Sequence, residues 1–204
     1  MSSEPIRDPR TDPLLTPANS VLVIIDYQPN QINTVKSMNA ELLVRNIVSV
    51  ARLGRTYGLP IVLSTVNADA GQGHTLPAIK EVLSENVEID GTQINSWEDV
   101  EFRKAVEATG RRKLIMCALW TEVCLAFPTL DALRAGYEVF PVVDAVGGTS
   151  VEAHRAGLER IVQAGAQPVS WVSLACELQR DWARGKTVPA VVDIVLTSRL
   201  LKGV

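Results

Sequence analysis

The strongest constraint on the fold is a series of short apolar runs in which polar and apolar residues do not alternate. The first run, 21–25, is Val-Leu-Val-Ile-Ile and ends at Asp26, and runs of similar character occupy 60–66, 113–119, 137–143 and 166–172. Successive side chains of a strand point to opposite faces, so an unbroken apolar run suits a strand that is buried on both faces. The runs therefore predict a mainly parallel β-sheet.

Helical patterns lie between these runs. Residues 96–110 begin with a capping-box pattern at Ser96 and Asp99 and end at Gly110, and residues 149–165 begin similarly at Thr149 and end at Gly165. Strands that alternate with helices require right-handed crossovers. We therefore expect an α/β protein with a three-layer, doubly wound fold, Rossmann-like, around a parallel sheet of about six strands.

The 204 residues contain no linker that would divide one core into two. Four prolines in residues 1–19 predict an extended N-terminal arm, because proline continues neither a helix nor a central strand. Residues 20–186 form the predicted single domain. We expect residues 187–204, which include a long apolar stretch, to pack on this domain or on a neighbouring subunit.

Charge and cysteine content exclude several classes of function. The net charge of −3 is spread along the chain and gives no surface typical of nucleic-acid or membrane binding, so we expect a small-molecule substrate. The N-terminus resembles no secretory signal and no apolar run is long enough to span a bilayer, which predicts a cytoplasmic location. Three cysteines and two distant histidines form neither a disulfide framework nor a metal-ligand motif, so we expect no metal and no cofactor.

Ligands of doubly wound sheets bind beyond the carboxyl ends of the strands. That rule selects the residues that follow the apolar runs, which are Asp26, Asn67, Asp69, Trp120 to Cys124 and Asp144. Position alone does not make Asp26 catalytic, because aspartates at strand ends commonly cap helices. Asp26 therefore needs a chemical partner.

Cys124 is the candidate partner. It follows the run 113–119 at the expected start of a helix that Thr121 would cap, where the helix dipole and free N–H groups favour a thiolate and lower the pKa of the thiol. The same N–H groups suit an oxyanion. We interpret Cys117 and Cys176 as buried small apolar residues. Three aromatic residues either wall a pocket or pack in the core: Trp97, Trp120 and Phe127.

Four motifs resemble one known family. They are Val-Ile-Ile-Asp-Tyr-Gln around Asp26, Ile-Asn-Ser-Trp at 94–97, Thr-Glu-Val-Cys-Leu-Ala-Phe-Pro at 121–128 and Ala-Cys-Glu-Leu-Gln-Arg-Asp-Trp at 175–182. Together they are similar to the isochorismatase-like cysteine hydrolase superfamily, and within it to the YcaC-like branch. The resemblance extends over residues 21–182.

The resemblance implies a metal-free cysteine hydrolase of a small amide or related carbonyl compound that forms a homo-oligomer. Asp26 would take the thiol proton, Cys124 would form an acyl-enzyme, and a non-proline cis peptide bond before Thr121 would shape the oxyanion hole. The residues expected around the substrate and oxyanion are Gln28, Asn95, Trp97, Trp120, Thr121, Val123 and Phe127.

One departure from the family pattern affects this interpretation. The family has a basic residue a few positions before Asn-Ser-Trp, but residues 88–93 here are Glu-Ile-Asp-Gly-Thr-Gln. Without that cation, Asp26 and a thiolate would place two negative charges in one pocket, which raises the thiol pKa or leaves Asp26 protonated. We expect Lys80, Arg103 and Lys104 to be surface residues.

Two alternatives to the hydrolase stay open. The missing cation is compatible with a catalytically impaired homologue that is retained for ligand binding or oligomer assembly. A redox role for Cys124 is the weaker alternative, because the sequence offers no evident resolving cysteine.

Overall fold

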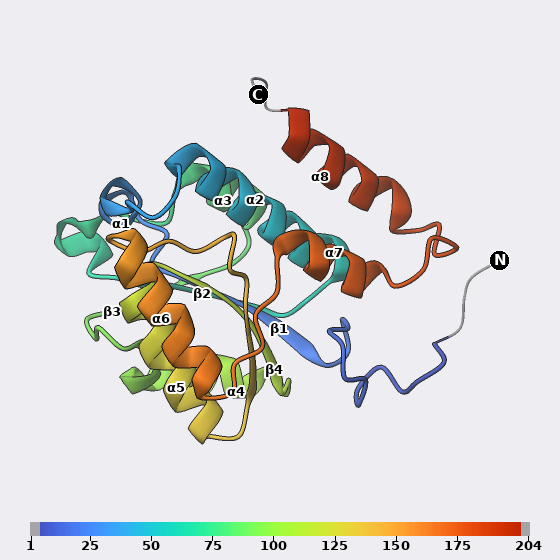
Figure 1. Cartoon of the computed structure of the whole chain (residues 1–204), viewed down its shortest axis with the longest axis horizontal. Helices are drawn as coiled ribbons and strands as arrows, with labels where there is room; N and C mark the ends of the chain where they lie inside the picture. Colours follow the sequence, from blue (N-terminus) through green and yellow to red (C-terminus); the bar gives the residue numbers. More distant parts are fainter. Residues whose placement is uncertain (1–4, 201–204) are drawn as a thin grey trace.

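The computed structural model describes residues 5–200, with side chains to residue 196, and its centre is a parallel sheet (Figure 1). The sheet has five strands in the order β3-β2-β1-β4-β5. Their bounds are β1 Ser20–Ile25, β2 Ile61–Val66, β3 Glu88–Gly91, β4 Lys113–Ala118 and β5 Glu138–Pro141. The predicted α/β fold with a parallel sheet is confirmed, with five strands where we expected about six.

The difference lies in the last apolar run. Residues 166–172 contribute a single bridge between Val142 and Val169, and helix α7 (Trp171–Gln179) begins directly afterwards. Conversely, none of the predicted apolar runs includes β3. Its residues are half-buried or exposed, because β3 is an edge strand that pairs with β2 alone.

Helices cover both faces of the sheet (Figure 1). Helices α2, α3 and α7 lie on one face, and α4, α5 and α6 lie on the other. The bounds are α1 Pro29–Thr34, α2 Ala40–Tyr57, α3 Pro77–Val82, α4 Val100–Ala108, α5 Ala126–Arg134, α6 Val151–Gln163, α7 Trp171–Gln179 and α8 Val188–Leu200. Two short turns matter below: the 3-10 turn η2 (Ser96–Glu98) and the π-helical turn η3 (Thr121–Leu125).

Two helices begin later than predicted, α4 by one turn and α6 by one residue. Asp99, not Ser96, caps α4, since its carboxylate accepts the N–H groups of Glu101 and Phe102 at 2.7 and 3.1 Å. Ser150, not Thr149, caps α6, and Thr149 instead donates to Glu122.

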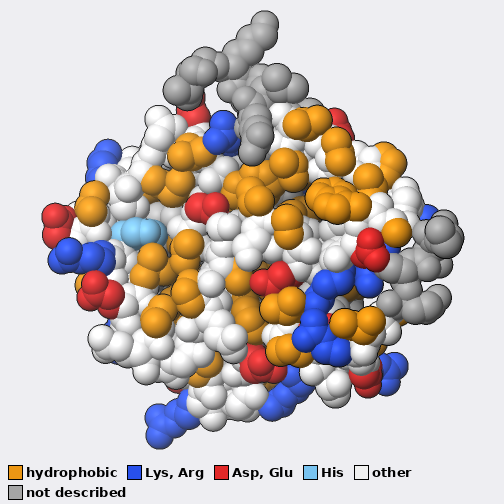
Figure 2. All heavy atoms as spheres, turned by 45° about the vertical axis from the view of Figure 1, so that its right-hand side comes forward, with side chains coloured by type: hydrophobic (Ala, Val, Ile, Leu, Met, Phe, Trp, Pro, Cys, Tyr) orange, Lys and Arg blue, Asp and Glu red, His pale blue; other side chains and the backbone are white. Residues whose placement is uncertain are grey.

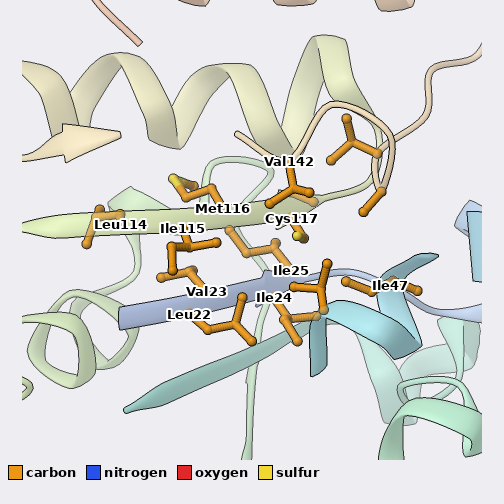
Figure 3. Close-up of a cluster of buried hydrophobic side chains, with 14 of the residues drawn as sticks. Leu22, Val23, Ile24, Ile25, Ile47, Leu114, Ile115, Met116, Cys117 and Val142 are labelled. Atoms are coloured by element: carbon orange, nitrogen blue, oxygen red, sulfur yellow. The ribbon is translucent and has the colours of Figure 1, made fainter. Parts of the chain in front are cut away.

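The core centres on β1 and β4, whose residues are all buried. Figure 3 shows their side chains gathered with Ile47 of α2 and Val142. Cys117 lies in this cluster, which confirms that it is a buried apolar residue. The same prediction for Cys176 is wrong, because α7 turns this thiol to the surface.

Both terminal segments contact the domain. The arm inserts Leu15, which is fully buried, and its carbonyls at Asp12 and Pro13 accept hydrogen bonds from the Lys113 ammonium group. Helix α8 lies beside α2, where Asp193 pairs with Arg52 at 2.6 Å. No helix in the described part of the chain is both long enough and apolar enough to cross a bilayer.

Candidate functional site

Asp26 is the first residue beyond β1, at the carboxyl edge of the sheet. Its side chain is 2% exposed, and its backbone has φ of 60°. Few residues adopt this left-handed region, although aspartate and asparagine tolerate it better than most. The turn fixes a carboxylate at the buried end of the central strand, and its Oδ1 atom has no hydrogen-bond partner among the described residues.

Cys124 reaches the same place from the neighbouring strand. β4 pairs with β1 up to Ala118 and Ile25, and the chain then enters η3, which carries Cys124 with 7% of its surface exposed. The thiol and the Asp26 carboxylate are close enough for each to change the pKa of the other. The fold therefore brings this acid and this sulfur together, and their catalytic roles stay a prediction.

Burial changes the acidity of Asp26 most. The pKa of Asp26 is raised from 3.8 to about 7, and desolvation is the largest cause. The Cys124 thiol lowers this pKa, whereas the negative charge of Asp90 raises it further. A carboxyl group with a pKa near 7 is half ionised at neutral pH and therefore suits general acid–base catalysis.

The pKa of the Cys124 thiol is raised, so the sequence-based prediction of a lowered pKa is wrong. Desolvation is the largest cause, followed by the charge of Asp26 and its hydrogen bond with the thiol. Backbone groups of Trp120 and Cys124 lower the pKa but are outweighed. Two outcomes were expected without a nearby cation, and both occur: the pKa of the Cys124 thiol is raised, and Asp26 keeps its proton to near-neutral pH.

Asp90 is the site residue that sequence reasoning did not single out. It lies near the end of β3, inside the segment where the family pattern places a basic residue. Its carboxylate accepts hydrogen bonds from Thr65 Oγ1 at 2.9 Å and from the Ala68 N–H at 3.0 Å. The signal that could have found it is the carboxyl-edge rule, but β3 was not predicted as a strand.

The backbone around the sulfur provides the candidate oxyanion donors. The N–H groups of Thr121 and Val123 are taken by the carbonyls of Gly147 and Trp120, at 2.9 and 3.1 Å. The donors that act on the sulfur are instead those of Trp120 and Cys124. The non-proline cis peptide bond joins Leu119 to Trp120, one bond earlier than the bond directly before Thr121.

Thr121 does not cap the helix through its side chain. Its hydroxyl lies 2.8 Å from Nδ1 of His154 on α6, and the residue is fully buried. This contact links η3 to α6 and so supports the turn that carries the sulfur.

Two predicted pocket residues have their amides engaged within the protein. Gln28 bridges the end of β2 to residues 69–74, the glycine-rich loop. It donates to the carbonyls of Val66 and Gly73 and accepts the Val66 N–H. Asn95 caps η2 and donates to Asp131 at 2.7 Å. Both amides therefore shape the surroundings of the site, and their contact with substrate stays a prediction.

The three aromatic residues lie in different surroundings. Trp97 packs edge-to-face with Phe102 and Tyr137, at 6.3 and 5.5 Å between ring centroids. Phe127 faces Arg160 of α6. Trp120, which adjoins η3, donates its indole N–H to Thr34 Oγ1 at 2.9 Å. Of the three, Trp120 is the residue whose backbone acts on the Cys124 thiol.

The other carboxyl-edge candidates serve elsewhere. Asp144 accepts the Trp171 N–H at 2.8 Å and so holds the start of α7, and the exposed Asp69 pairs with His74 at 3.3 Å. Asn67 adopts φ of 49° at the entrance to the glycine-rich loop. Among the described residues, no three His, Cys, Asp or Glu side chains gather as a metal site requires.

The basic residues considered from sequence do not complete the site. The Lys80 amine donates to the Asn86 carbonyl at 2.9 Å and lies 3.9 Å from Glu88. Lys104 pairs with Glu101 on the surface, and Arg103 is exposed. The surface role expected for Arg103 and Lys104 is confirmed.

Comparison with known proteins places the chain in a family. The isochorismatase domain matches residues 20–173. The chain belongs to the isochorismatase family. Within this family it is 33% identical over 165 residues to the probable hydrolase YcaC of Escherichia coli K12, which covers 80% of this chain and 79% of that relative. It is therefore a YcaC-like, isochorismatase-family hydrolase.

Solved structures agree with the isochorismatase assignment. YcaC from Pseudomonas aeruginosa, crystallised with hexane-2,5-diol and covalent acrylamide, superimposes with a TM-score of 0.81 at 32% identity, over 92% of this chain and 98% of that one. The YcaC gene product of E. coli, described as an octameric hydrolase of unknown specificity, gives a TM-score of 0.81 at 29% identity, over 94% and 98% of the two chains.

The raised pKa of Asp26 predicts how stability depends on pH. Between about pH 4 and 7 the folded protein holds a proton on Asp26 that the unfolded chain has lost, so raising the pH favours unfolding. Asp26→Asn removes this penalty. In urea unfolding the variant should match the wild type near pH 4 and gain up to about 4 kcal/mol over it by pH 8. A difference that does not change with pH would contradict the burial of an ionisable Asp26.

Proposed function

We propose that this protein hydrolyses a small amide or related carbonyl compound through an acyl-enzyme on Cys124, with Asp26 as general base and without a metal. The observation that carries the proposal is the buried Asp26–Cys124 pair, in which the carboxyl pKa is about 7. An acid that titrates near neutrality beside a thiol can take the thiol proton when the substrate arrives.

The proposed reaction has two halves. In the first, the Asp26 carboxylate accepts the thiol proton as sulfur bonds to the carbonyl carbon, and the proton then passes to the amine as the C–N bond breaks. In the second, water attacks the thioester, Asp26 takes one water proton, and the C–S bond breaks while that proton returns to sulfur. The products are a carboxylic acid and an amine or ammonia, and the N–H groups of Trp120 and Cys124 would hold the oxyanion.

The relatives support a reactive nucleophile and a hydrolytic reaction. The P. aeruginosa YcaC structure contains covalent acrylamide, an electrophile that adds to thiols through its alkene, and the E. coli relative is described as a hydrolase of unknown specificity. The experiment that tests the proposal is rapid acid quenching during turnover of a panel of small amides, followed by mass spectrometry of the peptides. An acyl mass on Cys124 is expected. Amide hydrolysis with no acyl mass on Cys124, or no hydrolysis across the panel, would count against the proposal.

One observation favours the second candidate, a catalytically impaired homologue that binds ligand or serves assembly. Asp90 brings negative charge to Asp26, and the charged groups that affect the pKa of Asp26 and Cys124 in the described structure are carboxylates. The Asp90 variants in the Discussion separate this candidate from an active hydrolase.

We further propose that the chain forms a homo-oligomer. Hydrophobic side chains gather on one face of the molecule (Figure 2). Near the C-terminus, Trp182 between α7 and α8 and Leu196 of α8 are 66% and 49% exposed. The E. coli relative is octameric. Light scattering should therefore give a multiple of 22.2 kDa, and a monomer at micromolar concentration would refute this. The cytoplasmic location stays a prediction.

A further inference from the structure

Among the described residues, the charged groups that affect the pKa of Asp26 and Cys124 are carboxylates, so the site carries an excess of negative charge. Asp26 is 2% exposed and Cys124 is 7% exposed, so solvent screens their charges poorly. Asp90 acts on Asp26, and Asp26 acts on Cys124. An ionised Asp26 therefore lies within the field of the Asp90 carboxylate, and it adds its own negative charge beside the sulfur.

The groups that bind Asp90 are neutral. Its oxygens accept from Thr65 Oγ1 at 2.9 Å and from the Ala68 N–H at 3.0 and 3.2 Å. These contacts fix the carboxylate at the carboxyl edge without cancelling its charge. Lys80, one of the basic residues considered from sequence, is instead bonded to the Asn86 carbonyl and lies 3.9 Å from Glu88.

A second observation points to a missing donor. Asp26 Oδ1 is buried and has no hydrogen-bond partner among the described residues. A buried carboxylate oxygen without a donor is costly, and a charged N–H donor is the partner that stabilises it most. Asp26 Oδ1 is therefore a free hydrogen-bond acceptor beside the sulfur, and the Asp90 carboxylate makes its surroundings negative.

We infer that the substrate itself supplies the missing cation: the protein acts on small amides that carry a protonated amine or another ammonium group near the scissile carbonyl. The ammonium group would lie between the Asp26 and Asp90 carboxylates and donate to the free oxygen of Asp26. Anionic amides would be rejected by the same field. This inference rests on the proposed function, because it assigns a substrate class to the same nucleophile.

The test measures charge preference at Cys124 without requiring turnover. Wild-type protein is treated with three methanethiosulfonates of similar size, bearing 2-aminoethyl, 2-hydroxyethyl and 2-sulfonatoethyl groups, and the modified peptides are quantified by mass spectrometry. The exposed thiol of Cys176 is the internal reference, because its modification corrects for the intrinsic reactivity of each reagent. The ratio of Cys124 to Cys176 modification should follow the order cationic, neutral, anionic.

Asp90→Asn is the matched variant. Asparagine keeps an oxygen that accepts from Ala68 and Thr65 but removes the charge, and the preference for the cationic over the anionic reagent should fall about tenfold. Should this variant fail to fold, the order of the three reagents in the wild type still decides the matter.

The outcomes separate the two proposals. Equal ratios for all reagents, or fastest modification by the anionic one, would overturn the cationic substrate while the nucleophilic role of Cys124 stands. Failure of Cys124 to react with any reagent while Cys176 reacts would overturn the nucleophile and the substrate class together.

Discussion

Cys124→Ala is expected to lower kcat/KM for small-amide hydrolysis by about 10⁴-fold or more, because the variant has no atom that could form the acyl-enzyme. Asp26→Asn should cost about 10³-fold, since an amide cannot accept the thiol proton. Asparagine also tolerates the left-handed backbone at this position, so the fold should be kept. Release of ammonia from the best amide of the panel provides the measurement.

Cys176→Ala is the control for both variants. Cys176 is an exposed thiol on α7, outside the site, so its removal should leave the rate unchanged. Comparable rates in Cys124→Ala and the wild type would rule out the acyl-enzyme. If Cys124→Ala is inactive but Asp26→Asn is fully active, the nucleophile stands and the assignment of the base is wrong.

Asp90→Lys is expected to raise the hydrolysis of neutral small amides by at least about tenfold over the wild type. The Asp90 carboxylate repels the ionised form of Asp26, whereas a lysine ammonium group at this position would attract it. The pKa of Asp26 should therefore fall, and a Cys124 thiolate should be stabilised. Position 90 is better suited than position 91, where a new Cβ would lie 2.7 Å from the Asp99 carboxylate that caps α4. Steady-state rates on neutral and cationic amides provide the comparison.

Asp90→Met is the matched control for charge, because methionine is about as long as lysine but neutral. Both variants lose the hydrogen bonds from Thr65 and Ala68, so that loss is common to the two and they differ in the charge at position 90. A gain in Asp90→Lys that exceeds any gain in Asp90→Met shows that charge limits the wild-type protein. No gain on any amide, from a folded variant, would favour ligand binding over hydrolysis.

The sequence predicted those parts of the fold that an unbroken apolar run or a period-3.6 pattern records. β1 and β4 are unbroken apolar runs because both faces of the sheet are covered, and they position Asp26 and Cys124. β3 carries no such pattern, since an edge strand with Glu88 and Asp90 is only half-buried. The run 166–172 was misleading because its last two residues, Trp171 and Val172, already belong to helix α7, and short apolar runs do not distinguish a strand from a buried helix.

The candidate site was predictable in its residues but not in its electrostatics. Asp26 and Cys124 followed from their places at strand ends, whereas the pKa of a thiol depends on burial and on neighbours from distant segments. The sequence suggested stabilisation of a thiolate by the helix start, but desolvation and the Asp26 charge outweigh the backbone groups in the fold. The effect of the Asp90 charge was not predicted for the same reason, since only the sheet brings it near Asp26.

The most direct measurement of the Asp26–Cys124 pair is the rate at which iodoacetamide alkylates Cys124 between pH 5 and 10, followed by mass spectrometry in the wild type and in Asp26→Asn. Because Asp26 must be ionised to accept the thiol proton, the wild-type rate should rise in a step near pH 7 that the variant lacks. Identical pH profiles in the two proteins, after correction against Cys176, would show that the acid and the sulfur are not coupled.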